Sequence, residues 1–143
     1  MTRPAAPWTP VTAALAPVAM IGGWTLAAAL APGFDPVAGT ISALATDQVT
    51  RPWVMTAGLA LTGLCHLGTA AGLRPAALPG RALLGLGGLG TLAVAAFPVH
   101  VAPVAHGLAA GTAFVALAVW PAGAGCRRPT THDAARGLLD PPA

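Results

Sequence analysis

The chain has 143 residues, of which 55% are hydrophobic and only 8% are charged, and its formal net charge is +3. Soluble domains carry roughly 25% charged residues, so this composition cannot build a water-facing surface and excludes a soluble globular protein. The arginines are scattered and form no basic patch, so the positive charge does not indicate nucleic acid binding. The composition predicts a multi-pass membrane protein.

The first ten residues, 1–10, form a short proline-rich leader that ends where an apolar run begins. That run, Val11–Ala31, is as long as the ~20 residues that a membrane-spanning helix needs. A cleaved signal peptide is the alternative, but its apolar region is usually ~7–15 residues long. Pro32 would also directly follow the cleavage site. We therefore interpret Val11–Ala31 as an uncleaved first span.

One long polar segment, Pro32–Pro52, separates the first apolar run from the second, and it holds Asp35 and Asp47. Asp35 followed by proline is a favourable helix start, since the carboxylate can accept hydrogen bonds from the first backbone N–H groups. Apolar residues then recur at helical spacing. The pattern predicts a short helix over Pro36–Ala45 that lies along the membrane surface.

Three more apolar runs follow, each bounded by proline, arginine or tryptophan. We expect the second span over 54–73, the third over 82–99 and the fourth over 104–121. At ~1.5 Å per residue the shortest of them covers ~27 Å, just enough to cross the hydrocarbon core. Residues 122–143 form a polar tail that we expect to be disordered. The predicted fold is an all-α, four-span transmembrane bundle with one outward interfacial helix.

The distribution of arginine predicts the orientation of the spans. With four spans, the leader, the connection between the second and third runs, and the tail share one side of the membrane. Six of the seven arginines fall there, and only Arg51 falls on the other side. Since cytoplasmic loops carry an excess of Lys and Arg, we expect a cell-membrane protein with both termini in the cytoplasm. Pro32–Pro52 and the turn that holds His100 then face outward together.

Three of the apolar runs contain glycine motifs. Gly85–Gly90 has the letters of the dinucleotide-binding G-x-G-x-x-G fingerprint. That motif requires a preceding strand and an acidic residue about 20 positions on, and the sequence supplies neither. Small residues instead let membrane helices approach closely. We expect this role for Gly85–Gly90, Gly68–Gly72 and Gly107–Gly111, mainly within one chain, with a homo-oligomer as the alternative.

Histidine, aspartate and serine side chains are expected to gather at the outward end. A ligand there would contact Asp35, Ser42 and His106, with Asp47 and His100 close by. Histidine and carboxylate are common metal ligands, so Asp35, His100 and His106 are the candidates for a metal. Their spacing matches no metal motif, and we expect no metal and no cofactor. In the structural alternative Asp35 caps a helix, His106 bonds a loop carbonyl, and Asp47 and His100 are solvated.

His66 lies well inside the second span. An ionisable side chain is costly at that depth and usually faces the bundle interior or a water-filled cavity. We expect a neutral histidine that is hydrogen-bonded to a neighbouring hydroxyl, with Thr62, Thr69 and Thr91 as the candidate partners.

A set of short motifs along the chain carries a family resemblance. The motifs are Pro32-Gly33-Phe34-Asp35-Pro36 running into Thr40-Ile41-Ser42-Ala43-Leu44, then Gly58, Gly63, Leu73-Arg74, Phe97-Pro98 and His106-Gly107. In these motifs, over about Val11–Pro121, the chain resembles the bacterial integral-membrane family called domain of unknown function 998 (DUF998). The resemblance implies a helical membrane bundle, with about six spans in typical members against four here. It implies no activity, because the function of the family is unassigned.

The functional hypothesis is a non-enzymatic membrane protein that binds or senses a small polar or lipid headgroup ligand at its outer face. One alternative is a membrane-embedded hydrolase with a metal held by aspartate and histidine. Another is a structural subunit that packs through glycine-rich helix faces. The expected partners are the lipid bilayer and, in the last case, a second copy of the chain; nucleic acid is not expected.

Overall fold

The computed structural model describes residues 3–125, which fold into four long helices and one short 3-10 helix. These residues contain no strand, and each long helix is long and apolar enough to cross a membrane. The predicted all-α, four-span class is therefore confirmed. The elements in chain order are α1 (Thr9–Ala29), η1 (Ile41–Ala45), α2 (Pro52–Gly72), α3 (Leu78–Ala96) and α4 (Pro103–Gly123).

All four long helices have a proline at their first or second position. Proline suits the first turn because its missing N–H would have no intrahelical partner there, and its fixed φ is already helical. Each helix consequently begins before the start that its apolar run alone indicates, as α2 does at Pro52. At the other end of the chain, α4 continues through Pro121 to Gly123. Residues 126–143 of the expected tail lie outside the described residues.

The expected surface helix over Pro36–Ala45 forms only in its second half. Residues 36–39 are turns, and η1 begins after Thr40, whose hydroxyl accepts a hydrogen bond from the Ala43 N–H at 3.2 Å. Gly39 explains the interruption, because a Cβ at this position would lie 2.7 Å from the Asp35 carbonyl oxygen and would also collide with the Phe34 ring. The chain can fold this tightly only with glycine at 39.

The 3-10 helix η1 packs inward and does not lie along the surface. Its Leu44 is fully buried in a cluster with Met55 and Leu59 of α2 and Ala27 of α1. The hydrophobic core is therefore concentrated at the end of the molecule where the polar segment folds back onto α1 and α2. This packing fixes the position of the neighbouring residue Ser42.

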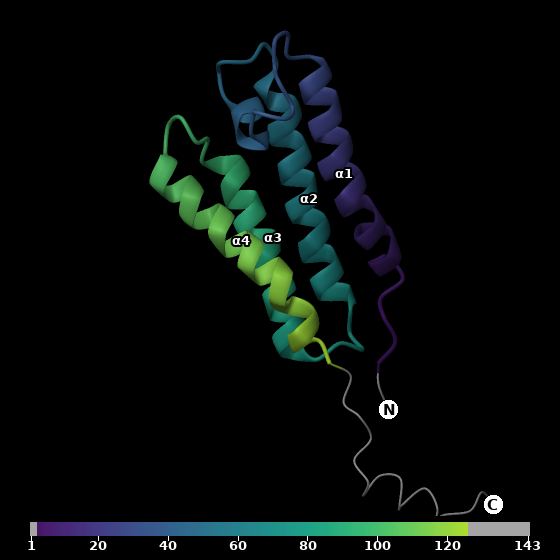
Figure 1. Cartoon of the computed structure of the whole chain (residues 1–143). Coiled ribbons are helices and arrows are strands. Elements are labelled where there is room, and N and C mark those ends of the chain that lie inside the picture. Colours follow the sequence, from purple (N-terminus) through teal and green to yellow (C-terminus); the bar gives the residue numbers. More distant parts are fainter. Residues whose placement is uncertain (1–2, 126–143) are drawn as a thin grey trace, which may run out of the picture.

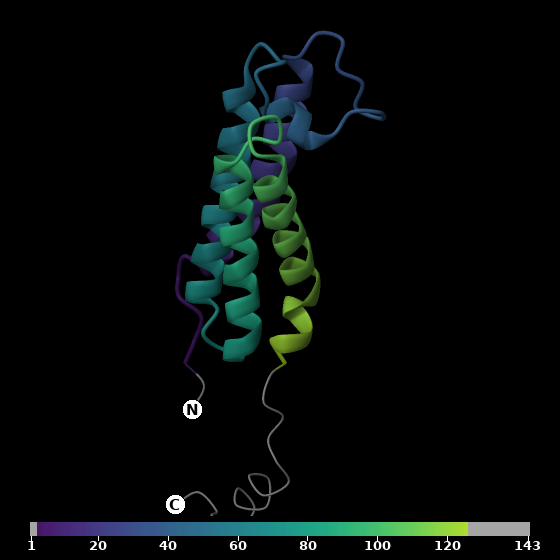
Figure 2. The ribbon, with the colours of Figure 1, turned by 90° about the vertical axis from the view of Figure 1, so that its left-hand side faces the viewer.

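The long helices are arranged as a row in chain order. α1 packs on α2, α2 on α3 and α3 on α4, and no comparable contact joins α1 to α4. Figures 1 and 2 show residues 30–51 and the α3–α4 connection together at one end of the helix axes. We call this the loop end. The first and last described residues lie at the opposite, terminal end.

Glycine allows close backbone contact between neighbouring helices. A Cβ on Gly23 of α1 would lie 3.0 Å from the Gly58 Cα of α2. A Cβ on Gly63 of α2 would lie 2.8 Å from the Gly88 carbonyl oxygen of α3. The third interface is similar, since a Cβ on Gly90 of α3 would lie 2.9 Å from a backbone nitrogen of α4. Small residues thus serve the close packing expected of membrane helices.

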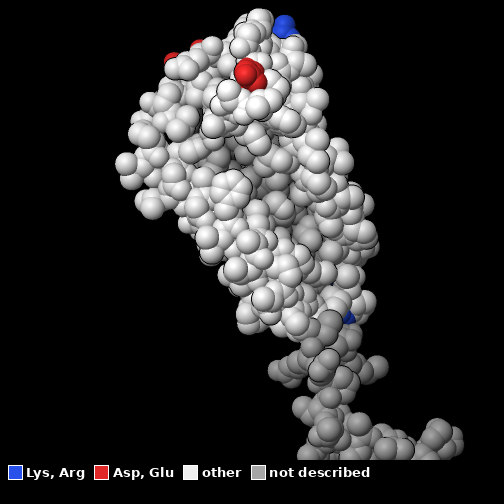
Figure 3. Space-filling view, in the orientation of Figure 1, with Lys and Arg blue, Asp and Glu red and all other residues white. Residues whose placement is uncertain are grey.

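Among residues 3–125, charged side chains lie only near the loop end and the terminal end. Figure 3 shows acidic and basic residues only near the two ends of the visible face, with an uncharged surface between them. At the terminal end Arg81 donates to the Ala70 and Ala71 carbonyl oxygens at 2.8 and 3.1 Å. It thereby satisfies carbonyls in the last turn of α2, which have no intrahelical partner. Arg74 lies over the Trp8 ring, 6.0 Å from its centroid.

Candidate functional site

A serine and a histidine that are far apart in the sequence meet at the loop end. η1 carries Ser42, and the first turn of α4 carries His106. The Ser42 Oγ lies 2.9 Å from the His106 Nε2. His106 is buried, with 7% of its surface exposed. The sequence grouped these two residues with Asp35 as candidate ligand contacts, and the structure brings Ser42 and His106 of that group together.

A second hydrogen bond fixes the tautomer of His106. Its Nδ1 lies 2.8 Å from the carbonyl oxygen of Phe97, the residue that follows α3 as its C-cap. A carbonyl oxygen can only accept, so the Nδ1 carries the hydrogen and donates it. In the neutral imidazole the Nε2 is then an acceptor, and the Ser42 hydroxyl donates to it. The ring is held between η1 and the end of α3, with its basic nitrogen directed at the serine.

Asp47 and His100 form a second contact between the polar segment and the α3–α4 connection. The Asp47 Oδ1 lies 3.4 Å from the His100 Nε2, and 78% of the Asp47 side chain is exposed. Exposed ion pairs contribute little to stability, because solvent screens the charges and both side chains lose freedom. The Ser42–His106 contact, in which His106 is buried, is therefore the stronger candidate of the two.

Asp35 does not join the other candidates. Its Oδ1 accepts hydrogen bonds from the Val37 and Ala38 N–H groups at 2.8 and 3.3 Å. It therefore caps the turn at 36–39, and the helix that it was expected to cap is absent. The candidate metal ligands Asp35, His100 and His106 do not converge, and residues 3–125 contain no group of three or more His, Cys, Asp or Glu side chains that could hold a metal.

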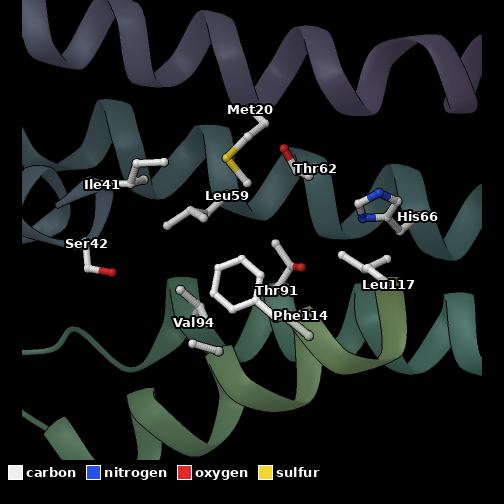
Figure 4. Close-up of a pocket in the computed structure, with 12 residues that line it drawn as sticks. Met20, Ile41, Ser42, Leu59, Thr62, His66, Thr91, Val94, Phe114 and Leu117 are labelled. Carbon is white, nitrogen blue, oxygen red and sulfur yellow. The ribbon is translucent and has the colours of Figure 1, made fainter. Parts of the chain in front are cut away.

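An apolar pocket of about 240 Å³ runs from this end into the bundle. Figure 4 shows Ser42 and His66 at its opposite ends, with Phe114 between them. All four long helices and η1 contribute to its wall. The lining residues are Met20, Ile41, Ser42, Leu59, Thr62, His66, Thr91, Val94, Ala110, Ala113, Phe114 and Leu117.

The pocket, which we call the lateral pocket, opens sideways between α1 and α4. These two helices do not close the row, and Figure 3 shows a hollow on the corresponding face. Phe114 of α4 lines the lateral pocket and is nevertheless 75% exposed, as expected of a side chain at its mouth. A mouth between two membrane-spanning helices would face the hydrocarbon core of the bilayer.

His66 has no hydroxyl partner, so the expectation that a threonine would bond it was wrong. Its Nδ1 is buried without any hydrogen bond. Thr62, Thr69 and Thr91 instead donate to carbonyl oxygens of their own helices at 2.7, 2.8 and 2.9 Å. Sequence reasoning did not place His66 in a shared cavity with Ser42. The signal was available, since Leu59, Thr62 and His66 follow the i, i+3, i+7 spacing of one helical face.

These features define an integral membrane helical bundle with a laterally open apolar pocket and a serine–histidine contact at one end of it. The comparison with protein families agrees with this class of protein and also identifies the family. The family described as "Protein of unknown function (DUF998)" matches residues 14–139, which is most of the chain. The chain belongs to the DUF998 family, and the resemblance seen in the short motifs is confirmed. Searches of curated proteins and of solved structures gave no match.

Proposed function

We propose that this protein binds a glycerophospholipid of the surrounding bilayer. One acyl chain would occupy the lateral pocket, and the headgroup region would lie beside Ser42 and His106 at the loop end. The observation that carries the proposal is the pocket itself, which is apolar and has at one end Ser42, whose hydroxyl is bonded to His106 behind it. The sequence led us to expect a ligand at the headgroup level; the proposal now includes the acyl chain of the same lipid.

The size and chemistry of the lateral pocket support a hydrocarbon occupant. Its volume of about 240 Å³ exceeds the ~150 Å³ of an engineered apolar cavity that binds benzene. The hydroxyls of Thr62 and Thr91 already donate to helix carbonyls, so these threonines present mainly their methyl groups. Lipid tails are as apolar as leucine, so moving a chain from bilayer to pocket brings no hydrophobic gain. Shape and the polar groups at the loop end must therefore provide the selectivity.

We expect photocrosslinking to detect this lipid directly. The purified protein would be placed in phosphatidylcholine vesicles that contain a phosphatidylcholine with a diazirine on one acyl chain. Ala110→Phe places a ring in the lateral pocket and should reduce crosslinking about tenfold, because the ring takes space that the acyl chain needs; a tenfold loss corresponds to ~1.4 kcal/mol of binding free energy. Adducts in the wild type should map to peptides from the lining of the pocket, and mass spectrometry would locate them.

The matched control is Val18→Phe on α1. Val18 is 63% exposed and does not line the lateral pocket, so this variant adds the same ring to the lipid-facing surface. Crosslinking should equal that of the wild type. Equal crosslinking in both variants and the wild type would show that the lipid contacts only the outer surface, and the proposal would be rejected.

We also propose that the loop end faces outward and both termini face the cytoplasm. Among residues 3–125, three arginines lie at the terminal end: Arg3 before α1, Arg74 in the α2–α3 connection and Arg81 near the start of α3. Arg51 is the only arginine of this range at the loop end. This is the asymmetry that the positive-inside rule requires. It supports the outward position of Ser42 and His106 that the ligand proposal assumes.

Cysteine labelling tests this orientation. In a Cys126→Ser background, a membrane-impermeant maleimide should label Gln48→Cys in intact cells. Pro75→Cys, in the α2–α3 connection, should react only after the membrane is permeabilised. Both positions are exposed, and Cys65 is buried, so the background signal should be low. The reverse labelling pattern would contradict the orientation.

The alternative of a structural subunit has one observation in its favour. A Cβ added at Gly107 or Gly111 of α4 would meet nothing within 4 Å. This glycine motif therefore contributes to no interface in residues 3–125, in contrast to the glycines of α2 and α3. Self-association through this face is compatible with an open lateral pocket, because Gly107 and Gly111 do not line it.

A further inference from the structure

We propose that Ser42 and His106 form a nucleophile and general base that cleave the ester of a lipid held in the lateral pocket. The inference rests on the proposed lipid binding and adds a reaction to it. Its substrate class is a glycerolipid with an ester-linked acyl chain. Ser42 is the only serine in the 143-residue sequence, which makes the assignment of the nucleophile unambiguous.

The geometry of the pair is that of an activated serine. A serine hydroxyl becomes an effective nucleophile when a base within about 2.6–3.2 Å can take its proton and a third group orients that base. The Ser42 Oγ to His106 Nε2 distance of 2.9 Å lies in this range. The Phe97 carbonyl is the third group, since it accepts from Nδ1 at 2.8 Å and leaves Nε2 free to accept the proton.

The third group also limits the reactivity. In a serine–histidine–aspartate triad the carboxylate orients the imidazole and stabilises the imidazolium that forms. The Phe97 carbonyl supplies the orientation and a partial negative charge, but no full charge. We therefore expect slow turnover compared with enzymes that have an acidic third residue. His106 is buried, with 7% of its surface exposed, so slow entry of the water needed for deacylation would limit turnover further.

The depth of the pair matches the depth of an ester group. His106 lies in the first turn of α4, and Phe97 is the C-cap of α3, so we expect both residues where the spans leave the hydrocarbon core. The ester carbonyls of a glycerolipid lie at the same level, between the acyl chains and the headgroup. A lipid with one chain in the lateral pocket would place its ester beside Ser42, which lines the pocket at that end.

The reaction needs only the lipid, the pair and water. The Ser42 oxygen attacks the ester carbonyl carbon and forms a new C–O bond while its proton moves to the His106 Nε2. The bond from that carbon to the glycerol oxygen breaks, and Nε2 returns the proton to the leaving alcohol. Water then attacks the acyl-serine, Nε2 takes a proton from it, and the fatty acid leaves as the Ser42 hydroxyl is restored. No atom changes oxidation state.

A long-chain alkyl fluorophosphonate tests the nucleophile, because such probes form a stable bond with activated serines. The folded wild type in detergent should give one adduct on the peptide that contains Ser42, and Ser42→Ala should give none. His106→Gln should slow labelling about 100-fold or more, in the range that a general base contributes. Val37→Ala, an exposed change in the same polar segment, should label like the wild type.

A second comparison, between folded and SDS-denatured wild type, tests the proposal even if His106→Gln does not fold. The denatured chain should not react, because activation requires the folded pair. No adduct on folded wild type, or equal rates in folded and denatured protein, would overturn the proposal. Diazirine–lipid crosslinking on the same wild-type sample separates the two proposals. Crosslinking without fluorophosphonate labelling leaves lipid binding intact and removes the reaction, whereas loss of crosslinking removes the lipid as substrate.

Discussion

Replacing Gly63 by alanine should lower the thermal unfolding midpoint of the protein, although alanine is the better helix former. The added Cβ would lie 2.8 Å from the Gly88 carbonyl oxygen and 3.0 Å from the Leu92 backbone nitrogen. A backbone cannot move aside as a flexible side chain can, so α2 and α3 would have to separate. Overpacking of this kind costs typically 1–3 kcal/mol, which exceeds or cancels the gain of about 1 kcal/mol in helix propensity.

The matched control for this prediction is Gly111→Ala on α4. It brings the same gain in helix propensity, and its Cβ would meet nothing within 4 Å. Its melting midpoint should equal or exceed that of the wild type when both are followed by circular dichroism in the same detergent. A Gly63→Ala midpoint at or above that of Gly111→Ala would show that α2 and α3 do not pack as closely as described.

Leu44→Ala should release the polar segment from the bundle. Leu44 is fully buried between η1, α1 and α2, and truncating such a side chain typically costs 2–5 kcal/mol. The four spans do not depend on η1 for their own hydrogen bonds. The loss of stability should therefore affect mainly residues 32–51. We expect faster limited proteolysis in this segment. We also expect loss of fluorophosphonate labelling, because Ser42 is two residues away on the same 3-10 helix.

Val37→Ala is the control for the segment. Val37 is 94% exposed, so its truncation removes no buried contact and should leave the proteolysis rate unchanged. If Leu44→Ala were cleaved no faster than Val37→Ala, the segment would be held by something other than the core cluster around Leu44.

The sequence was sufficient to predict the spans, because an apolar run of about 20 residues leaves few alternatives. The first residue of each helix was harder to predict. Pro52 and Pro103 look like loop residues when hydropathy is considered alone, and the structure places both at the first position of a helix. The approach of Ser42 to His106 followed from topology, since both positions fall at the same end of a four-span chain.

Two features of the site could be predicted only in part, for different physical reasons. Asp35 bonds backbone groups two and three residues ahead; such a cap was the structural alternative, and sequence pattern alone did not decide between it and a ligand contact. The lateral pocket depends on which face of each helix points inward. In a membrane span all faces are apolar, so the periodicity that reveals the inward face of a soluble helix is weak. His66 is the exception, because its helical spacing from Leu59 and Thr62 indicates the face of α2 that lines the pocket.

The row arrangement of the helices has a consequence for how the protein is made. Each long helix packs on the helix that precedes it in the chain, so every large interface joins segments that are synthesised one after the other. Contacts of this local kind form quickly and require little loop closure. α1 and α2 can pair while α3 and α4 are still in the ribosome. The bonds of the polar segment to His100 and His106 join distant parts of the chain and must wait for α4. Completion of the site is therefore the last step of assembly, so a chain that stalls before α4 inserts without a finished site.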